Sequence, residues 1–345
     1  MKRTLLALLA MLLFLQGCGE PPPPPPRVQT PTPAPSPTAA QEAPATPAAP
    51  VSPAPVAEQS QDSPLRAARR VFKTTLVPKE EKREKVDVPP PNIFSLVKYD
   101  AAPGALSAYL TPDPKDGKKH PAIIWITGGD CNSIGEIWRP AHPKNDQTAA
   151  AYRKAGIIMM FPSLRGGNDN PGVKEGFLGE VDDVLDAATY LAKQPYVDPA
   201  RIYLGGHSTG GTLVLLVAEV STRFRAVFSF GPVSNVGHYG PDYCPFNYRE
   251  TQELLLRAPG KWLSSVKSPV FVIEGTMPPA NADDLNKMRK DSTNPQIHFL
   301  SLPGATHFNT LAPMNTLIAE KILKDDRPAS NLTITPAELP KTFDK

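Results

Sequence analysis

The sequence predicts an α/β domain with a doubly wound, mostly parallel β-sheet. Runs of consecutive apolar residues at 122–127, 157–161 and 226–230 are typical of strands buried on both faces of a sheet. Segments with apolar residues at helical spacing follow such runs, and 180–193 is the clearest of them. Strands that alternate with helices indicate parallel pairing, and right-handed crossovers then cover both faces of the sheet.

Composition divides the chain before any element is assigned. Of the 43 prolines in 345 residues, 16 lie between positions 21 and 64, so that stretch has little to bury. Residues 89–345 carry no net charge, which argues against a nucleic-acid-binding domain. The presence of three cysteines argues against a disulfide scaffold, and a single long apolar run argues against a polytopic membrane protein.

The first 18 residues have the pattern of an export signal. Lys2 and Arg3 precede an apolar run at 4–15, which is too short to span a bilayer comfortably. The following Leu15-Gln16-Gly17-Cys18 resembles a bacterial lipobox, in which the cysteine is lipidated and becomes the mature N-terminus. We therefore expect a signal peptide over 1–18 and a lipid anchor at Cys18; a short uncleaved anchor is the alternative.

The residue after Cys18 is Gly19 and not Asp, which favours the outer membrane, facing the periplasm. Residues 19–64, rich in Pro, Ala, Ser and Thr, are expected to form a disordered tether, or less simply a ligand for a Pro-binding module. Residues 65–92 form a charged segment that we expect to be solvated. Weak contact with anionic lipid or envelope polymer is the alternative.

The predicted catalytic domain covers 93–325, and a tail of unassigned structure, which can pack back on the domain, covers 326–345. A Pro-Gly turn between 94–100 and 105–111 predicts a hairpin at the start. The further predicted strands are 122–127, 157–161, 201–204, 226–230, 270–273 and 297–302, and the predicted helices are 148–154, 180–193, 209–221, 283–290 and 309–324. The candidate motifs below follow the ends of these strands, where active sites of such sheets lie.

Gly206-His207-Ser208-Thr209-Gly210 has the pattern of a nucleophile elbow. It follows a predicted strand and opens a predicted helix, and the tight turn requires very small residues on either side of the nucleophile. We therefore predict that Ser208 is the nucleophile. His207 lies inside the elbow and is expected to pack rather than to act as the base.

His307 is the predicted general base. It lies in the loop after the last predicted strand, 99 residues after Ser208, which is the required order. His298, in a strand, and His238 and His142, in loops, are weaker candidates.

The triad acid departs from the usual pattern, because Pro278 stands at the loop position where an acid is expected. Glu274, at the end of the strand before that loop, is the preferred acid. Asp242, Asp283 and Asp284 are alternatives, and a Ser–His pair without an acid is another.

The oxyanion hole is expected from backbone N–H groups at two strand ends. Gly128-Gly129 closes the predicted strand 122–127, and a glycine pair there lets an N–H of Gly129 or Asp130 face the nucleophile. The N–H of Thr209 would be the second donor.

Several segments together resemble prolyl-oligopeptidase-type (S9-like) α/β-hydrolases. They are residues 161–167 (FPSLRGG), 180–183 (EVDD) and 196–202 (YVDPARI), followed by the elbow. The resemblance covers about 120–325. It implies an α/β-hydrolase fold and a serine hydrolase that acts on acyl carbonyls. By position, the resemblance assigns Ser208 as the nucleophile and His307 as the base. The family's catalytic Asp has no counterpart in this sequence.

Peptidases of this family usually have an N-terminal propeller, and only 93–120 precedes the third predicted strand. We therefore expect a single catalytic domain without a propeller. This favours an esterase or deacylase of small or surface-bound substrates over a peptidase.

Cys131 follows the predicted oxyanion turn and Cys244 follows a later strand, so both are expected on the same side of the sheet. In an exported protein a Cys131–Cys244 disulfide is one hypothesis, and two buried thiols are the other. No Cys/His spacing suggests zinc.

The sequence as a whole predicts a lipid-anchored serine hydrolase of the cell envelope that needs no cofactor or metal and cleaves an ester or peptide-like amide bond. The alternative is a hydrolase-like binding protein with weak or no turnover. Expected partners are a small-molecule or peptide substrate and the membrane, with no nucleic acid.

Overall fold

The computed structural model describes residues 63–77, 83–341 and 343. The predicted signal peptide, Cys18 and residues 19–62 of the predicted tether lie outside these residues. The last two residues of that tether, Ser63 and Pro64, instead begin a helix: Ser63 is the N-cap of α1 (Pro64–Arg70), and its hydroxyl accepts from the N–H of Arg66 at 3.1 Å.

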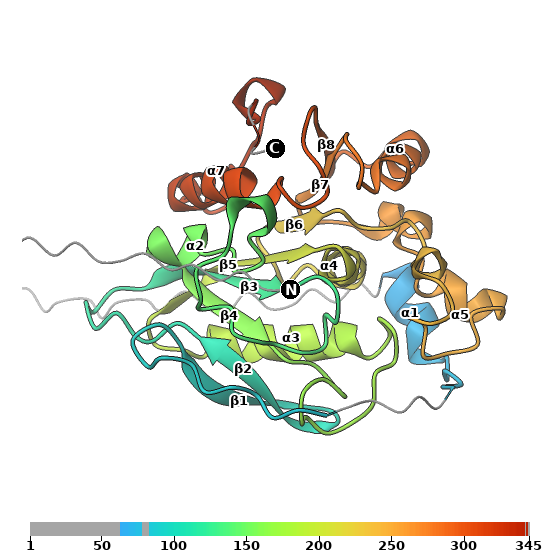
Figure 1. Cartoon of the computed structure of the whole chain (residues 1–345), viewed down its shortest axis with the longest axis horizontal. Coiled ribbons are helices and arrows are strands. Elements are labelled where there is room, and N and C mark those ends of the chain that lie inside the picture. The colour runs from blue at the N-terminus through green and yellow to red at the C-terminus, as the bar shows by residue number, and fades with distance from the viewer. Residues whose placement is uncertain (1–62, 78–82, 342, 344–345) are drawn as a thin grey trace, which may run out of the picture. The chain divides into compact units, whose positions relative to one another are not determined.

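The sheet has eight strands, and its order β1-β2-β4-β3-β5-β6-β7-β8 runs from bottom to top in Figure 1. The strands β1 and β2 form an antiparallel hairpin, β2 pairs antiparallel with β4, and the remaining pairs are parallel. The predicted α/β class with a mostly parallel sheet is confirmed. The bounds are β1 (Ser95–Ala101), β2 (Gly104–Leu110), β3 (His120–Ile126), β4 (Ile158–Pro162), β5 (Val197–His207), β6 (Val227–Phe230), β7 (Val270–Gly275) and β8 (Ile297–Leu302).

Helices cover both faces of the sheet and divide its core in two. One buried cluster packs against α1, α3, α4 and α6, and the other against α2 and α7. The remaining bounds are α2 (Ala151–Lys154), α3 (Glu180–Ala192), α4 (Thr209–Val220), α5 (Thr251–Leu255), α6 (Ala282–Asp291) and α7 (Leu311–Lys324). No helix among the described residues is long and apolar enough to cross a bilayer.

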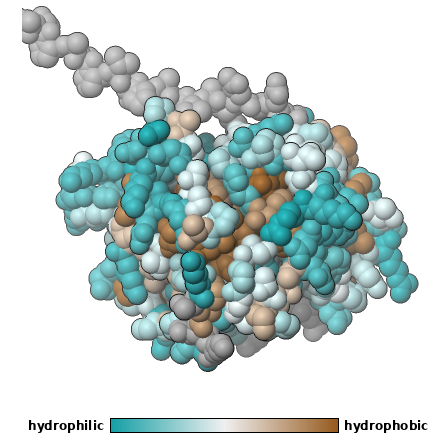
Figure 2. All heavy atoms as spheres, turned by 90° about the horizontal axis from the view of Figure 1, so that it is seen from above, coloured by the Kyte–Doolittle hydropathy of each residue, from teal (hydrophilic) through white to brown (hydrophobic). Residues whose placement is uncertain are grey.

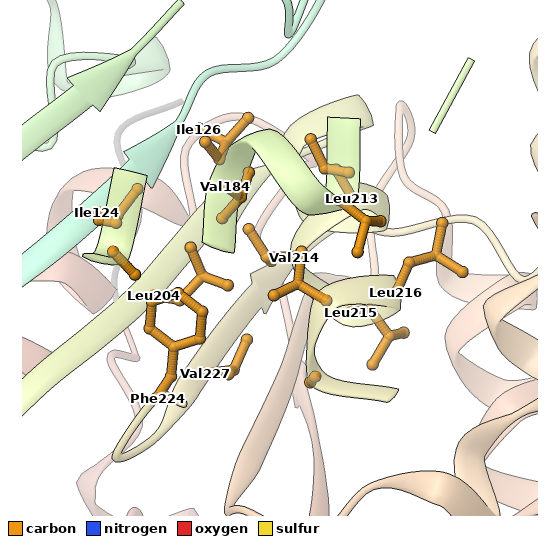
Figure 3. Packing of buried hydrophobic residues seen from close by; sticks show 14 of the residues in the cluster. Ile124, Ile126, Val184, Leu204, Leu213, Val214, Leu215, Leu216, Phe224 and Val227 are labelled. Carbon is orange, nitrogen blue, oxygen red and sulfur yellow. The ribbon is translucent and has the colours of Figure 1, made fainter. Parts of the chain in front are cut away.

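The helix α4 lies at the centre of the first cluster, and all twelve of its residues are buried. Figure 3 shows Leu213 and Val214 of α4 beside Val184 of α3 and close to strand residues such as Ile126 and Leu204. A helix that is apolar on every side is a core helix. Its packing holds its first turn, where the predicted nucleophile lies, in a set position.

Residues 63–77 differ from the prediction of a solvated charged segment. Leu65 is fully buried in the first cluster, and Leu76 forms an antiparallel bridge with Phe246. The segment therefore packs on the domain, and Figure 1 shows α1 near α5 at one edge of the molecule.

The tail after α7 packs back on the domain, as the sequence allowed. Leu332 and Ile334 are buried in the second cluster. The Arg225 guanidinium pairs with Asp325, which also accepts from Ser330 and from the N–H of Asn331.

On the face seen in Figure 2, hydrophobic residues gather in the middle and hydrophilic residues surround them.

Candidate active site

The predicted nucleophile lies between β5 and α4 in a strained backbone conformation. Ser208 has φ 56° and ψ −116°, a region that residues with a side chain rarely adopt. A Cβ on Gly210 would lie 2.3 Å from the carbonyl oxygen of Ile126, so only glycine fits where α4 meets the end of β3. This is the strand–turn–helix context that the elbow pattern predicts.

The structure brings Glu274 and His307 together. The His307 Nδ1 and the Glu274 Oε2 are 2.8 Å apart, in a buried contact between the end of β7 and the loop after β8. The Glu274 carboxylate also accepts from the N–H of Gly275 at 2.7 Å and the N–H of Asn281 at 2.9 Å. These donors hold the carboxylate in place against the Nδ1 side of the His307 ring.

Two of the three alternative acids lie in α6, and the third, Asp242, lines the same cavity as Ser208. Asp284 accepts from the N–H and the hydroxyl of Ser234 and contacts His238. Asp283 is exposed at the start of α6, and Asp242 lines the cavity described below. Among the candidates, Glu274 is the one in contact with the His307 ring.

Glycine 231, which the sequence did not single out, allows this pair to form. A Cβ at Gly231 would lie 2.3 Å from Cε1 of His307 and 2.9 Å from Oε2 of Glu274. Its carbonyl accepts from the side-chain amide of Asn281 at 2.8 Å. The signal available in the sequence was a glycine directly after the strand β6.

His207 connects the elbow to the loop of His307. Its Nε2–H donates to the His307 carbonyl at 3.0 Å, and the two rings are 4.5 Å apart. Its Nδ1 accepts from the amide Nε2 of Gln147 at 2.8 Å. Burial, together with the neighbouring His307, lowers the pKa of His207 to about 3, so the ring is neutral and packs as predicted.

The oxyanion turn is tied to both the elbow and this histidine. The N–H of Gly128 donates to Oε1 of Gln147 at 3.2 Å, and the hydroxyl of Thr209 donates to the carbonyl of Gly129 at 2.9 Å. Gln147 was missed in the sequence, since a glutamine in a loop carries no pattern. The predicted donors Gly129 and Thr209 line one cavity with Ser208.

This cavity of about 500 Å³ opens beside Ser208, and aromatic rings form part of its wall. Tyr239 and Tyr243 line it, with ring centroids 5.0 Å apart, and Phe177 stacks on them at 6.0 and 5.8 Å. The other lining residues are Gly129, Asp130, Asn132, Lys174, Gly176, Thr209, Asp242 and Pro245. Such walls suit an apolar group next to the nucleophile.

The two cysteines are free thiols, so the hypothesis of a Cys131–Cys244 disulfide is wrong. The Cys131 Sγ lies 3.7 Å from the Tyr243 hydroxyl, and burial raises the pKa of this thiol to about 12. A buried, protonated thiol behaves as a small hydrophobic side chain. The Cys244 Sγ contacts the carbonyl of Val236 at 3.8 Å.

The remaining candidate histidines lie outside the site. His298 stacks on Phe271 within the sheet, and His142 caps a short 3₁₀ turn. His238 contacts Asp284, as noted above. Within the described part of the chain, no cluster of three His, Cys, Asp or Glu side chains could hold a metal ion.

Part of the chain is similar to known proteins. Residues 143–257 match the model of the prolyl oligopeptidase family. The chain is similar to the Bacillus subtilis protein named uncharacterized peptidase YuxL, with 28% identity over 185 residues, which is 48% of this chain and 27% of that protein. It is also similar to dipeptidyl-peptidase 5 of Porphyromonas gingivalis, with 28% identity over 154 residues, 42% of this chain and 20% of that protein.

The fold resembles the crystal structure of Porphyromonas gingivalis dipeptidyl peptidase 4. The TM-score is 0.55 at 18% identity, over 68% of this chain and 35% of that one. The chain thus spans about a quarter or less of the curated relatives it matches first.

Proposed function

We propose that this chain, which has the α/β-hydrolase fold of the prolyl-oligopeptidase type, is a serine hydrolase that cleaves ester or peptide-like amide bonds. The observation that carries the proposal is the buried Glu274–His307 contact at the sheet edge where the strained Ser208 elbow lies. Two of the similar proteins are named an uncharacterized peptidase and a dipeptidyl-peptidase, and these names support the same reaction class.

The proposed reaction uses these groups in turn. The Ser208 hydroxyl attacks the substrate carbonyl while Nε2 of His307 takes its proton, and Glu274 stabilises the resulting imidazolium. The N–H of Thr209 and that of Gly129 or Asp130 stabilise the oxyanion. His307 then protonates the leaving group, and water attacks the acyl-enzyme with His307 again as the base.

The cavity next to Ser208 suggests which part of the substrate it binds. Tyr239 and Tyr243, backed by Phe177, offer an apolar surface, and the Asp130–Lys174 pair, 3.2 Å apart, lies at its polar side. We infer an apolar acyl side chain in this cavity. Burial raises the pKa of Tyr239 and Tyr243 well above the usual value, so both hydroxyls are neutral.

The location at the cell envelope remains part of the proposal. It is supported by the charged start, the apolar run 4–15 and the lipobox-like Leu15-Gln16-Gly17-Cys18. In a bacterial host, the wild type should incorporate labelled palmitate, and Cys18→Ser should abolish that incorporation. A membrane-associated wild type that incorporates no palmitate would support the uncleaved anchor instead.

The proposed nucleophile can be tested by reacting the full chain with a fluorophosphonate probe and locating the adduct by mass spectrometry. We expect an adduct on Ser208 that is absent in Ser208→Ala and forms far more slowly in His307→Ala. Glu274→Gln should lower kcat for an ester substrate by on the order of 10³–10⁴, because an amide cannot stabilise the imidazolium.

Asp283→Asn is the matched control for Glu274→Gln, since this exposed carboxylate lies at the start of the neighbouring helix α6. It should leave kcat unchanged within about twofold. A folded wild-type chain that gives no adduct on Ser208 would contradict the enzyme proposal and favour a hydrolase-like binding protein.

A further inference from the structure

Residues 63–77, which precede the sheet, contact the segments that form the wall of the cavity beside Ser208. The N–H of Val77 donates to the carbonyl of Pro245 at 2.8 Å, and Leu76 forms a bridge with Phe246. Pro245 lines the cavity. We call residues 63–77 the strap.

Arg69 of the strap binds two distant segments with one guanidinium group. It donates to the carbonyls of Phe177 at 3.0 Å, Leu178 at 3.4 Å and Leu256 at 2.7 Å. Burial lowers its pKa to about 10, so the group remains charged at neutral pH. Because a guanidinium is a rigid planar fork, these bonds hold the 177–178 loop and the end of α5 at a set separation.

A second set of contacts, a few residues later in the strap, joins the strap to α5 and to the same loop. The Thr74 hydroxyl donates to the Glu253 carboxylate at 3.0 Å, and the N–H of Thr75 donates to it at 2.8 Å. The Arg257 guanidinium, paired with Glu253, donates to the Thr74 hydroxyl and to the carbonyl of Glu175, both at 2.9 Å. The buried side chains of Glu253 and Arg257 therefore join the strap, α5 and the loop before Phe177.

Phe177 is the residue through which these contacts reach the cavity. Its φ is 72°, a strained value for a bulky residue, which persists only where surrounding contacts hold it. Its ring is buried and stacks on Tyr239 and Tyr243, which line the cavity, and its own carbonyl accepts from Arg69.

We propose that the strap is a specificity-determining element: through Arg69 and Thr74 it positions Phe177, through Val77 it holds the Pro245 segment, and so it sets the shape of the cavity for the acyl group. This inference rests on the proposed hydrolase function. Arg69 and Thr74 are positioning residues, because they act through the loop of Glu175 and Phe177 and do not line the cavity themselves. Loss of the strap contacts should therefore change selectivity among acyl groups more than the chemistry at Ser208.

The test is Arg69→Met in the full chain, which keeps an apolar stem and removes the donors. Substrates are p-nitrophenyl acetate, butyrate and octanoate. We expect kcat/KM for octanoate relative to acetate to change about tenfold or more, mainly through KM, since apolar subsites discriminate by roughly that much. The rate of fluorophosphonate labelling should stay within about twofold.

Arg223→Met is the matched control, because Arg223 also donates to a backbone carbonyl, that of Ala188 at 3.4 Å, away from the cavity. It should leave the selectivity ratio unchanged. Thr74→Val, which is nearly isosteric, serves as the second variant if Arg69→Met does not fold. A lowered Tm with an unchanged selectivity ratio in the strap variants would overturn the proposal.

Hydrogen exchange separates this inference from the proposed function. In Arg69→Met, amides of 175–178 and 239–246 should exchange faster, while those of 129–131 keep their wild-type rates. If the folded wild type gives no fluorophosphonate adduct on Ser208 but the exchange pattern holds, the hydrolase proposal fails and the positioning role of the strap stands. Equal exchange in the variant and the wild type would exclude that role.

Discussion

His207 has both ring nitrogens engaged by neighbours of fixed hydrogen-bonding character. The Gln147 amide N–H can only donate, and the His307 carbonyl can only accept, so the ring must be neutral with its proton on Nε2. The ring therefore positions the oxyanion turn and the base loop relative to each other. His207→Ala should lower kcat by roughly 10–100-fold with little change in KM, because small displacements of catalytic groups cost that much.

His207→Gln keeps an N–H near the Nε2 position and should recover part of the lost kcat, whereas equal losses in both variants would contradict this role.

The pH dependence of thermal stability is an independent test of the neutral His207 ring. Because the pKa of His207 is about 3 in the folded chain and about 6.5 when unfolded, the unfolded state binds the extra proton first. Tm should therefore fall as the pH drops from about 6.5 toward 3, and less steeply in His207→Gln than in the wild type.

At the scale of elements, the contact between α4 and the end of β3 depends on Gly210. A Cβ there would meet the carbonyl oxygens of Ile126 at 2.3 Å and Thr127 at 2.6 Å, which are backbone atoms that cannot rotate away. Gly210→Ala should destabilise the fold by roughly 1–3 kcal/mol and slow fluorophosphonate labelling. Gly135→Ala, where a Cβ meets nothing within 4 Å, should change neither urea unfolding nor labelling.

The helices α1 and α5 are the elements that the sequence analysis missed. Both are short, with seven and five residues, so neither has a full apolar period to detect. A start signal was nevertheless present for α1, since Ser63 is followed by Pro64 at the first helical position. The charge of residues 65–92 favoured the prediction of a solvated segment, but Arg69 donates to a backbone carbonyl within the domain.

For the molecule as a whole, the tail after α7 closes the second core. Each fully buried Leu or Ile stabilises a fold by about 1.5–3 kcal/mol, and Leu332 and Ile334 are both buried there. Deleting 326–345 should therefore lower the free energy of unfolding by roughly 3–6 kcal/mol, measured by urea denaturation. Asp326→Ala, at an exposed position, is the control; a deletion as stable as this control would show that the tail does not contribute.

The sequence by itself determined the sheet class, the order of the strands and of the longer helices along the chain, and the elbow around Ser208. These features depend on apolar periodicity and on glycines within a few residues, which are local along the chain. It also pointed to His307 and preferred Glu274, since Glu274 lies at the end of one strand and His307 follows another, and these strand ends meet at one edge. The tertiary structure decided which groups touch. Glu274 and His307 are 33 residues apart, Gln147 and His207 are 60 apart, and Arg69 and Leu256 are 187 apart. Such contacts depend on how crossovers bring distant segments together, and no local pattern encodes them.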